Sequence, residues 1–188
     1  MNKKDTVVFD LDGTLLDTLE DLKNSVNYAM TQCGYPEHTL DEVRRYVGNG
    51  ILLLMQRAIP GGKDDPNFDK AFTLFKEHYG KHCNDTTKPY AGIMELLHTL
   101  KENNIKIAIV SNKADFAVKE LNAIYFKDLI LVAIGEKESE GIRKKPAPDT
   151  VIEALKQLGS TAENSVYIGD SDVCLLYTSD AADDKARV

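Results

Sequence analysis

The chain has 188 residues, with 23 Lys and Arg against 30 Asp and Glu, 43% hydrophobic residues and three Cys. This composition is typical of a globular protein with one core domain that can carry a smaller inserted one, and it argues against a disordered chain or a repeat array. The formal net charge of −7 argues against a broad phosphate-backbone footprint, so we expect no nucleic-acid partner. A small anionic ligand would have to meet a local positive site.

The three cysteines, Cys33, Cys83 and Cys174, are widely spaced and form no zinc-type pattern with one another or with histidine. This usage predicts a reduced, cytoplasmic protein. The N-terminus runs into a strand-like segment without an apolar signal region, and the longest aliphatic run, at 51–55, is too short to cross a membrane. We therefore expect neither secretion nor a membrane partner.

The first predicted element is a buried strand at 6–9, a β-branched and aromatic run that stops at Asp10, before an Asp-Gly turn. Helical periodicity then extends from residue 17 to Cys33 and ends at Gly34. Three further helices are expected at 39–47, 51–59 and 67–82, the first of them opened by the capping-box pattern Thr39-Leu40-Asp41-Glu42. The segment after the first strand is therefore predicted to be helical.

Helices and strands alternate in the second half of the chain, which predicts a parallel sheet with crossover helices. Helices are expected at 93–100, 114–123 and 150–158, and strands at 105–110, 130–134 and 166–168. The strands at 105–110 and 130–134 are continuous aliphatic runs, typical of strands buried on both faces. We predict an α/β fold, with a Rossmann-like parallel sheet core at 1–15 and 87–173 and an α-helical cap inserted at 16–86.

Polar residues follow the predicted strands, where open parallel sheets bind their ligands. They are Asp10, Asp12, Ser111, Asn112, Lys113, Lys145 and Asp170. The two-residue spacing directs Asp10 and Asp12 to the same side, where two carboxylates can divide the roles of nucleophile or metal ligand and proton carrier. Asp170 would complete an oxygen site for Mg²⁺. The serine hydroxyl and the lysine ammonium groups are what a phosphoryl group requires.

Four segments resemble, in order, the motifs of the haloacid dehalogenase superfamily. They are Asp10-Leu11-Asp12-Gly13-Thr14-Leu15, Ser111-Asn112-Lys113, Lys145-Pro146-Ala147-Pro148-Asp149 and Gly169-Asp170-Ser171. Within the superfamily the chain is most similar to the phosphoglycolate phosphatases and their close relatives, and the resemblance covers residues 6–173. It implies a Mg²⁺-dependent phosphatase that hydrolyses a small phosphomonoester, with 2-phosphoglycolate as the expected substrate.

The resemblance also implies a role for each motif residue. Asp10 would attack phosphorus to form an aspartyl-phosphate, and Asp12 would protonate the leaving alcohol and then deprotonate the hydrolytic water. Asp10, the main-chain carbonyl of Asp12, and Asp170 would hold Mg²⁺. Phosphate-binding roles fall to Ser111, Asn112 and Lys145, and a substrate-selecting role in the cap falls to Gly48, Asn49 and Gly50. An acid at position 12 favours phosphatases and phosphomutases over the dehalogenases and ion pumps of the superfamily.

Other functions stay open at this point. A pyrophosphatase or a sugar phosphomutase would use the same core. A receiver-like signalling domain also takes up phosphate on Asp, but its acceptor follows the third strand, which ends here in Gly135-Glu136. His78 and His82 lie four residues apart on one predicted helix, but without a third ligand at usable spacing they are expected to be surface histidines.

The fourth motif of the superfamily normally has a further acidic residue at the position of Cys174. The sequence from Cys174 onward resembles a translated sequencing adapter, so we expect residues 174–188 to be a non-native tail on a C-terminally truncated core. The natural chain would then have an aspartate at that position and continue into another helix and strand. Without that strand, the strand at 166–168 would form an exposed apolar edge. If Cys174 is native, a non-catalytic phosphate-binding remnant is the alternative.

Overall fold

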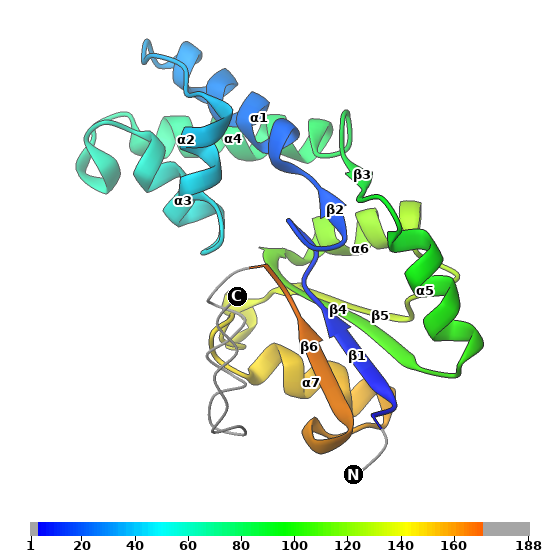
Figure 1. The fold of residues 1–188 in the computed structure, drawn as a ribbon. Coiled ribbons are helices and arrows are strands. Elements are labelled where there is room, and N and C mark those ends of the chain that lie inside the picture. Colours follow the sequence, from blue (N-terminus) through cyan, green and yellow to red (C-terminus); the bar gives the residue numbers. More distant parts are fainter. Residues whose placement is uncertain (1–3, 171–188) are drawn as a thin grey trace. The chain divides into compact units, whose positions relative to one another are not determined.

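The computed structural model describes residues 4–170. The chain forms two compact units (Figure 1). Unit 1 joins the segment up to Leu15 to the chain from Ala91 onward, and unit 2 runs from Leu16 to Tyr90. The second junction lies after Tyr90 rather than after Thr86, where the sequence placed it, because strand β3 (Lys88–Pro89) pairs with strand β2 (Leu16–Asp17) inside unit 2.

Unit 1 contains a parallel sheet with the strand order β5-β4-β1-β6. Its strands are β1 (Thr6–Phe9), β4 (Lys106–Ala114), β5 (Val132–Glu136) and β6 (Ser165–Ile168). The helices of this unit are α5 (Ile93–Glu102), α6 (Asp115–Tyr125) and α7 (Asp149–Leu158), with short 3-10 turns at Glu138–Glu140 and Ala162–Asn164. This alternation confirms the predicted α/β core with its helical insertion after the first strand.

One face of the sheet packs against helix α7. The buried residues of this core come from the α7-facing side of β1, β4 and β5 and from α7 itself. They are Val8, Ala108, Val110, Val132, Ile134, Val151, Ala154 and Leu155. The prediction of burial holds along β4, whose residues from Ile107 to Lys113 are all buried. It is wrong at Leu131, which is 86% exposed because β5 begins one residue later and is a terminal strand of the described sheet.

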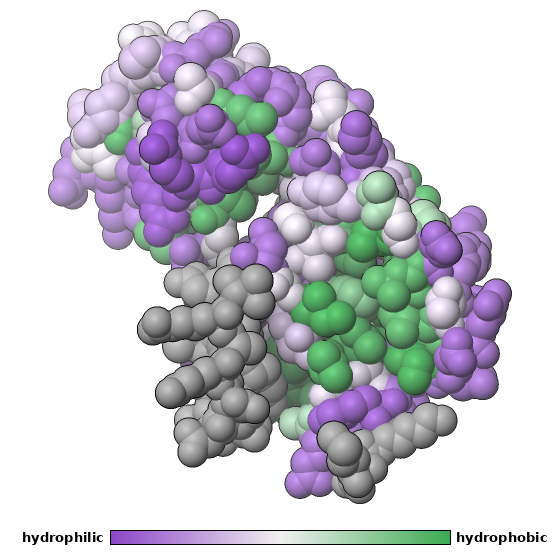
Figure 2. Space-filling view, in the orientation of Figure 1, coloured by the Kyte–Doolittle hydropathy of each residue, from purple (hydrophilic) through white to green (hydrophobic). Residues whose placement is uncertain are grey.

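Strand β6 forms the other border of the sheet among residues 4–170. Its Val166 and Ile168 are exposed, as are Met94 and Leu96 of α5. Figure 2 shows apolar side chains gathered on unit 1 in the region where Figure 1 draws β1, β4 and α5. Within the described residues, β6 is thus a border strand with two exposed apolar side chains, and the predicted exposed edge of the whole chain stays a prediction. The expected tail at 174–188 lies outside the described residues.

Unit 2 is built mainly of helices. They are α1 (Leu19–Gln32), α2 (Leu40–Tyr46), α3 (Ile51–Ala58) and α4 (Phe68–His82), with a 3-10 turn at Gly62–Asp64. Their apolar stripes form one core, in which Val26, Met30, Met55 and Phe75 are fully buried. No helix in the part of the chain that the structure describes has the length and apolar character needed to cross a membrane.

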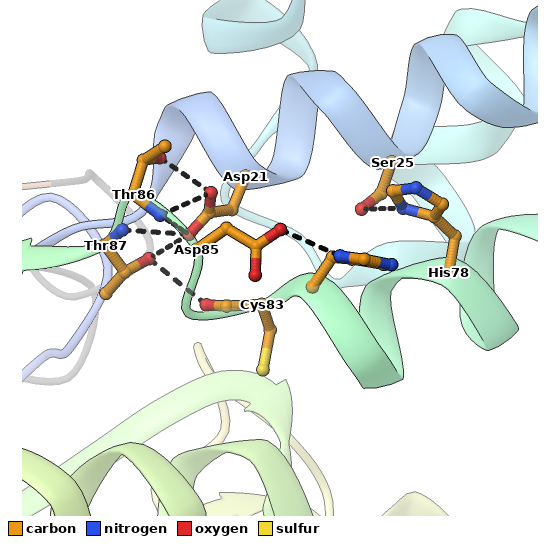
Figure 3. A network of polar contacts seen from close by, with 8 residues as sticks. Asp21, Ser25, His78, Cys83, Asp85, Thr86 and Thr87 are labelled. Atoms are coloured by element: carbon orange, nitrogen blue, oxygen red, sulfur yellow. Dashed lines mark hydrogen bonds and ion pairs between the residues drawn. The ribbon is translucent and has the colours of Figure 1, made fainter.

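The two ends of unit 2 are joined by a buried carboxylate (Figure 3). Asp21 of α1 is 1% exposed and accepts hydrogen bonds from the main-chain N–H groups and hydroxyls of Thr86 and Thr87, at 2.6 to 3.1 Å. Burial alone would raise the pKa of Asp21, but these hydrogen bonds outweigh it and lower the pKa. We name Asp21, Thr86 and Thr87 the aspartate clamp.

His78 and His82 are each engaged with neighbours on the same unit. Their rings stack at 4.3 Å, His78 Nδ1 lies 3.0 Å from Ser25 Oγ, and His82 Nδ1 lies 2.8 Å from Asp85 Oδ2. Figure 3 shows the His78 ring directed toward Ser25. Both histidines are partly buried, and the expectation that they are surface histidines without a metal stays a prediction.

Candidate active site

Asp10 directly follows β1 at the carboxyl edge of the sheet and is 7% exposed. Its main-chain N–H donates to the carbonyl of Ile168 at 2.8 Å, which ties the end of β1 to the end of β6. One carboxylate oxygen accepts from the N–H of Leu11 at 2.8 Å, and the other lies 2.7 Å from Nζ of Lys145. Asp10 is therefore a buried carboxylate held by a main-chain donor and a cation.

Asp12 lies in the turn that follows, where Gly13 adopts a φ of +77° and the N–H of Leu15 donates to the carbonyl of Leu11 at 3.0 Å. A Cβ atom added at Gly13 would lie 2.1 Å from Oδ2 of Asp170, so this turn needs glycine both for its backbone conformation and for the room that Asp170 occupies. The Asp12 carboxylate lies 2.8 Å from Nζ of Lys113, whose side chain is only 2% exposed.

The residues at the end of β4 hold one another in place. Ser111 Oγ accepts a hydrogen bond of 3.3 Å from the N–H of Lys113. The amide of Asn112 makes a reciprocal pair with the main chain of Lys145: Nδ2 donates to the Lys145 carbonyl at 3.0 Å, and Oδ1 accepts from the Lys145 N–H at 2.9 Å. Asn112 therefore anchors the loop that carries Lys145.

Lys145 is 5% exposed and brings its ammonium group to the carboxyl edge of the sheet from the loop after β5. Besides Asp10, Nζ donates to the hydroxyl of Tyr167 at 2.9 Å, and that hydroxyl donates to the carbonyl of Val110 at 3.0 Å. Tyr167 lies in β6, three residues before Asp170. Tyr167 thus connects β4 and β6 with the buried cation.

The charges at this edge are arranged in pairs. The ammonium groups of Lys145 and Lys113 lie against Asp10 and Asp12. Although Asp170 keeps contact with solvent, its carboxyl is partly desolvated, which raises its pKa, and the charge of Asp10 raises the pKa further. Carboxylates beside buried ammonium groups can supply a nucleophile and a proton carrier, and the cations can bind an incoming anion.

A Mg²⁺ site can be tested against these donors. Among residues 4–170, no three side chains of His, Cys, Asp or Glu form a group that could hold a metal ion. The predicted set needs only two carboxylates, of Asp10 and Asp170, because its third donor is the main-chain carbonyl of Asp12. The negative charges of Asp10 and Asp12 both raise the pKa of Asp170, so a cation would relieve their repulsion. These oxygen donors suit Mg²⁺.

The structure brings most of the predicted site residues to one edge of unit 1: Asp10, Asp12, Ser111, Asn112, Lys145 and Asp170. The predicted cap residues Gly48, Asn49 and Gly50 lie in unit 2, between α2 and α3, where both glycines have positive φ angles. Cys174 lies outside the described residues, so the prediction about its position stays a prediction.

Sequence reasoning missed Tyr167. Its only local signal is an aromatic residue in a β-branched strand, which predicts a core position and not a polar contact. The contact needs Lys145 and Val110, which are distant from Tyr167 in the sequence. The partner of Lys113 was missed for the same reason, since Asp12 lies 101 residues earlier.

The chain is similar to known proteins in sequence and in structure. The family model described as haloacid dehalogenase-like hydrolase matches residues 7–175. The phosphoglycolate phosphatase of Aquifex aeolicus is 32% identical over 170 residues, which are 88% of this chain and 76% of that protein. That of Pseudomonas putida is 32% identical over 171 residues, and the chain spans only 62% of its length. A crystal structure from Lactobacillus delbrueckii subsp. bulgaricus matches with a TM-score of 0.85 at 32% identity, over 95% of this chain and 83% of that one.

Proposed function

The chain belongs to the haloacid dehalogenase-like hydrolase family, and from that premise we propose that it is a Mg²⁺-dependent phosphatase acting on a small phosphomonoester. The observation that carries the proposal is the buried pair of Asp10 and Lys145, 2.7 Å apart, with the Asp12 carboxylate two residues further along the chain. The names of the relatives support 2-phosphoglycolate as the substrate to test first.

In the proposed reaction a carboxylate oxygen of Asp10 attacks phosphorus. The bond between phosphorus and the ester oxygen breaks, and the leaving oxygen takes a proton from the carboxyl group of Asp12. Asp12 then accepts a proton from water as that water attacks phosphorus and displaces the Asp10 carboxylate. Orthophosphate leaves, and both aspartates return to their starting states.

The cations and the serine serve the phosphoryl group. Lys145 already faces Asp10, so a phosphoryl group that reaches the Asp10 oxygen also meets the ammonium group. Ser111 offers its hydroxyl at the end of β4, and Asn112 keeps the main chain of Lys145 in place. Nζ of Lys113 contacts a side-chain oxygen of Asp12, which fixes the position of the proton carrier.

Asp10, the main-chain carbonyl of Asp12, and Asp170 would hold the Mg²⁺ ion. When bound, the ion would neutralise charge on the phosphoryl oxygens. The proposal also assigns the selection of the substrate to Gly48, Asn49 and Gly50 of unit 2.

The test is the release of phosphate from 2-phosphoglycolate, pyrophosphate and a panel of sugar phosphates, with and without Mg²⁺. We expect Mg²⁺-dependent hydrolysis with 2-phosphoglycolate as the best substrate. Asp10→Asn should lower kcat by about a thousandfold or more, because an amide does not replace the nucleophile. Asp64→Asn makes the same chemical change at an exposed position of unit 2 and should leave kcat unchanged. Full activity of Asp10→Asn would contradict the proposal.

A further inference from the structure

Tyr167 joins the buried ammonium group of Lys145 to the backbone of the central sheet. Its residue position in β6 pairs with Val8 of β1, and its side chain packs with the core on the α7 face of the sheet. Its hydroxyl lies 2.9 Å from Lys145 Nζ and 3.0 Å from the Val110 carbonyl oxygen. Nζ lies 5.5 Å from the ring centre, so the hydroxyl and not the ring makes the close contact.

The chemistry of these three groups fixes the direction of both hydrogen bonds. A main-chain carbonyl can only accept, so the single hydroxyl proton of Tyr167 points to Val110. An ammonium group can only donate, so the lone pairs of the Tyr167 oxygen face Lys145. Hydrogen bonds in such a chain polarise one another. The bond to Val110 therefore makes the Tyr167 oxygen a stronger acceptor for the Lys145 ammonium group.

We propose that Tyr167 is a positioning residue that keeps the Lys145 ammonium group at the phosphoryl site throughout the reaction. This inference rests on the proposed function. Once the Asp10 oxygen is bonded to phosphorus, Asp10 no longer has the full negative charge that pairs with Lys145. The Tyr167 oxygen stays the same neutral acceptor in every step. It therefore holds the ammonium group when the ion pair with Asp10 is weakened.

The contacts of the main chain show why such a second partner is useful. Asn112 fixes the backbone of Lys145, but a flexible four-carbon stem separates that backbone from the charge. Ordering a lysine side chain is costly in conformational entropy. Tyr167 fixes the charged end of the stem, as Asn112 fixes its base.

The experiment is a double-mutant cycle of Tyr167→Phe and Lys145→Ala in the full chain, with 2-phosphoglycolate and Mg²⁺. Because a hydrogen bond to a charged group is removed, Tyr167→Phe should lower kcat by about tenfold to a hundredfold and change KM by less than about threefold. In the Lys145→Ala background, Tyr167→Phe should lower kcat by no more than about twofold, since its effect passes through Lys145. Tyr28→Phe in unit 2 is the matched control and should leave kcat unchanged.

A role limited to packing predicts a different pattern. The proposal would be overturned if Tyr167→Phe lowered kcat by the same factor in the wild-type and Lys145→Ala backgrounds. It would also be overturned if Tyr167→Phe left kcat unchanged in the wild-type background. A second readout does not depend on turnover: the ¹⁵N-bound ammonium protons of Lys145, seen by NMR, should exchange faster with water in Tyr167→Phe than in wild type or Tyr28→Phe. Unchanged exchange would also overturn it.

The two proposals can fail separately. If wild type releases no phosphate from any substrate and Asp10→Asn behaves like it, the proposed function fails. Faster exchange of the Lys145 ammonium protons in Tyr167→Phe would still support the positioning contact in that case.

Discussion

Two buried aspartates show how differently the two units neutralise a carboxylate. Asp10 of unit 1 is 7% exposed and faces the ammonium group of Lys145 at 2.7 Å. Asp21 of unit 2 is 1% exposed and is held by two main-chain N–H groups and two hydroxyls of Thr86 and Thr87. The first carboxylate is balanced by a full charge on a long side chain, and the second by neutral donors close to the backbone.

This difference separates a reactive carboxylate from a structural one. An ammonium group has three donors, so Lys145 can bind an arriving phosphoryl group while Tyr167 still holds it, without a change in the fold. The donors of the aspartate clamp cannot move unless the segment at 86–87 moves as well. We therefore expect substitutions at the edge of unit 1 to change activity, and substitutions in the clamp to change stability.

The largest expected effect is on catalysis, at Asp12. Asp12→Asn removes the proposed proton carrier but keeps the shape of a side chain that is 20% exposed. We expect kcat to fall by about a hundredfold to ten thousandfold. The free energy of unfolding should fall by about 1–2 kcal/mol, because the buried Lys113 ammonium group loses its charged partner but keeps an amide oxygen as acceptor. Steady-state kinetics and urea unfolding measure the two quantities. A large loss of stability with little loss of kcat would reverse the distinction between the units.

The next effect is on stability, at Asp21. Asp21→Asn places an NH₂ group against donors of Thr86 and Thr87, so buried donors lose their acceptor. We expect the free energy of unfolding to fall by about 2–4 kcal/mol. Asp64→Asn, at an exposed position of the same unit, should change it by less than about 0.5 kcal/mol. Equal urea midpoints for the two variants would show that the clamp does not stabilise unit 2.

The clamp also predicts how stability depends on pH. Burial opposes ionisation of Asp21, but the hydrogen bonds from Thr86 and Thr87 lower its pKa in the folded chain below the ordinary value of 3.8. A lowered folded-state pKa gives stability that is present above the ordinary value and is lost as the pH falls through the folded-state value. The difference in unfolding free energy between wild type and Asp21→Asn should therefore shrink as the pH falls below about 4. A constant difference down to pH 2 would contradict this assignment.

Close backbone packing supports the site in unit 1. Gly135 of β5 is buried, and its N–H donates to Asp115 Oδ1 at 2.9 Å. A Cβ atom added at Gly135 would lie 2.3 Å from Asp115 Cα and 2.6 Å from the Lys113 carbonyl oxygen. These are backbone atoms, so Gly135→Ala should lower the free energy of unfolding by about 1–3 kcal/mol. Gly80→Ala, in helix α4 with open space at its Cβ position, should instead stabilise the chain by about 0.5–1 kcal/mol. Urea unfolding of both variants distinguishes packing from helix propensity.

The sequence predicted the strand ends of unit 1 well because chemistry and topology coincide there. An apolar run that stops at Asp10 or before Asp170 marks both a strand and its carboxyl end. It did not predict that β4 continues through Ser111 to Ala114, since this extension depends on renewed pairing of Ala114 with Glu136 after an irregularity. The two-residue strands β2 and β3 were also missed, because so short a pairing leaves no periodicity.

The polar contacts that organise the two units could not be predicted from local patterns. Asp21 has the signature of an acidic residue in the first turn of a helix, and its partners Thr86 and Thr87 lie 65 and 66 residues later. Tyr167 looks like a core aromatic until Lys145 and Val110 are placed beside its hydroxyl. Such roles depend on long-range packing, which the residue types alone do not encode.

The smallest expected effect tests whether burial or the donor set makes the clamp strong. The capping box of α2, which the sequence did predict, also holds a carboxylate with donors of a threonine: Glu42 Oε2 accepts from the N–H and the hydroxyl of Thr39 at 2.7 and 2.8 Å. These groups are exposed, so water can replace the lost contacts. Thr39→Ala should lower the free energy of unfolding by about 1 kcal/mol, and Thr73→Ala, on the exposed face of α4, by less than about 0.5 kcal/mol. If Thr39→Ala lowers the free energy of unfolding as much as Asp21→Asn does, the donor set and not burial determines the strength of the clamp. The difference between Asp10 and Asp21 would then come from the kind of donor that each carboxylate meets, and not from how deeply each is buried.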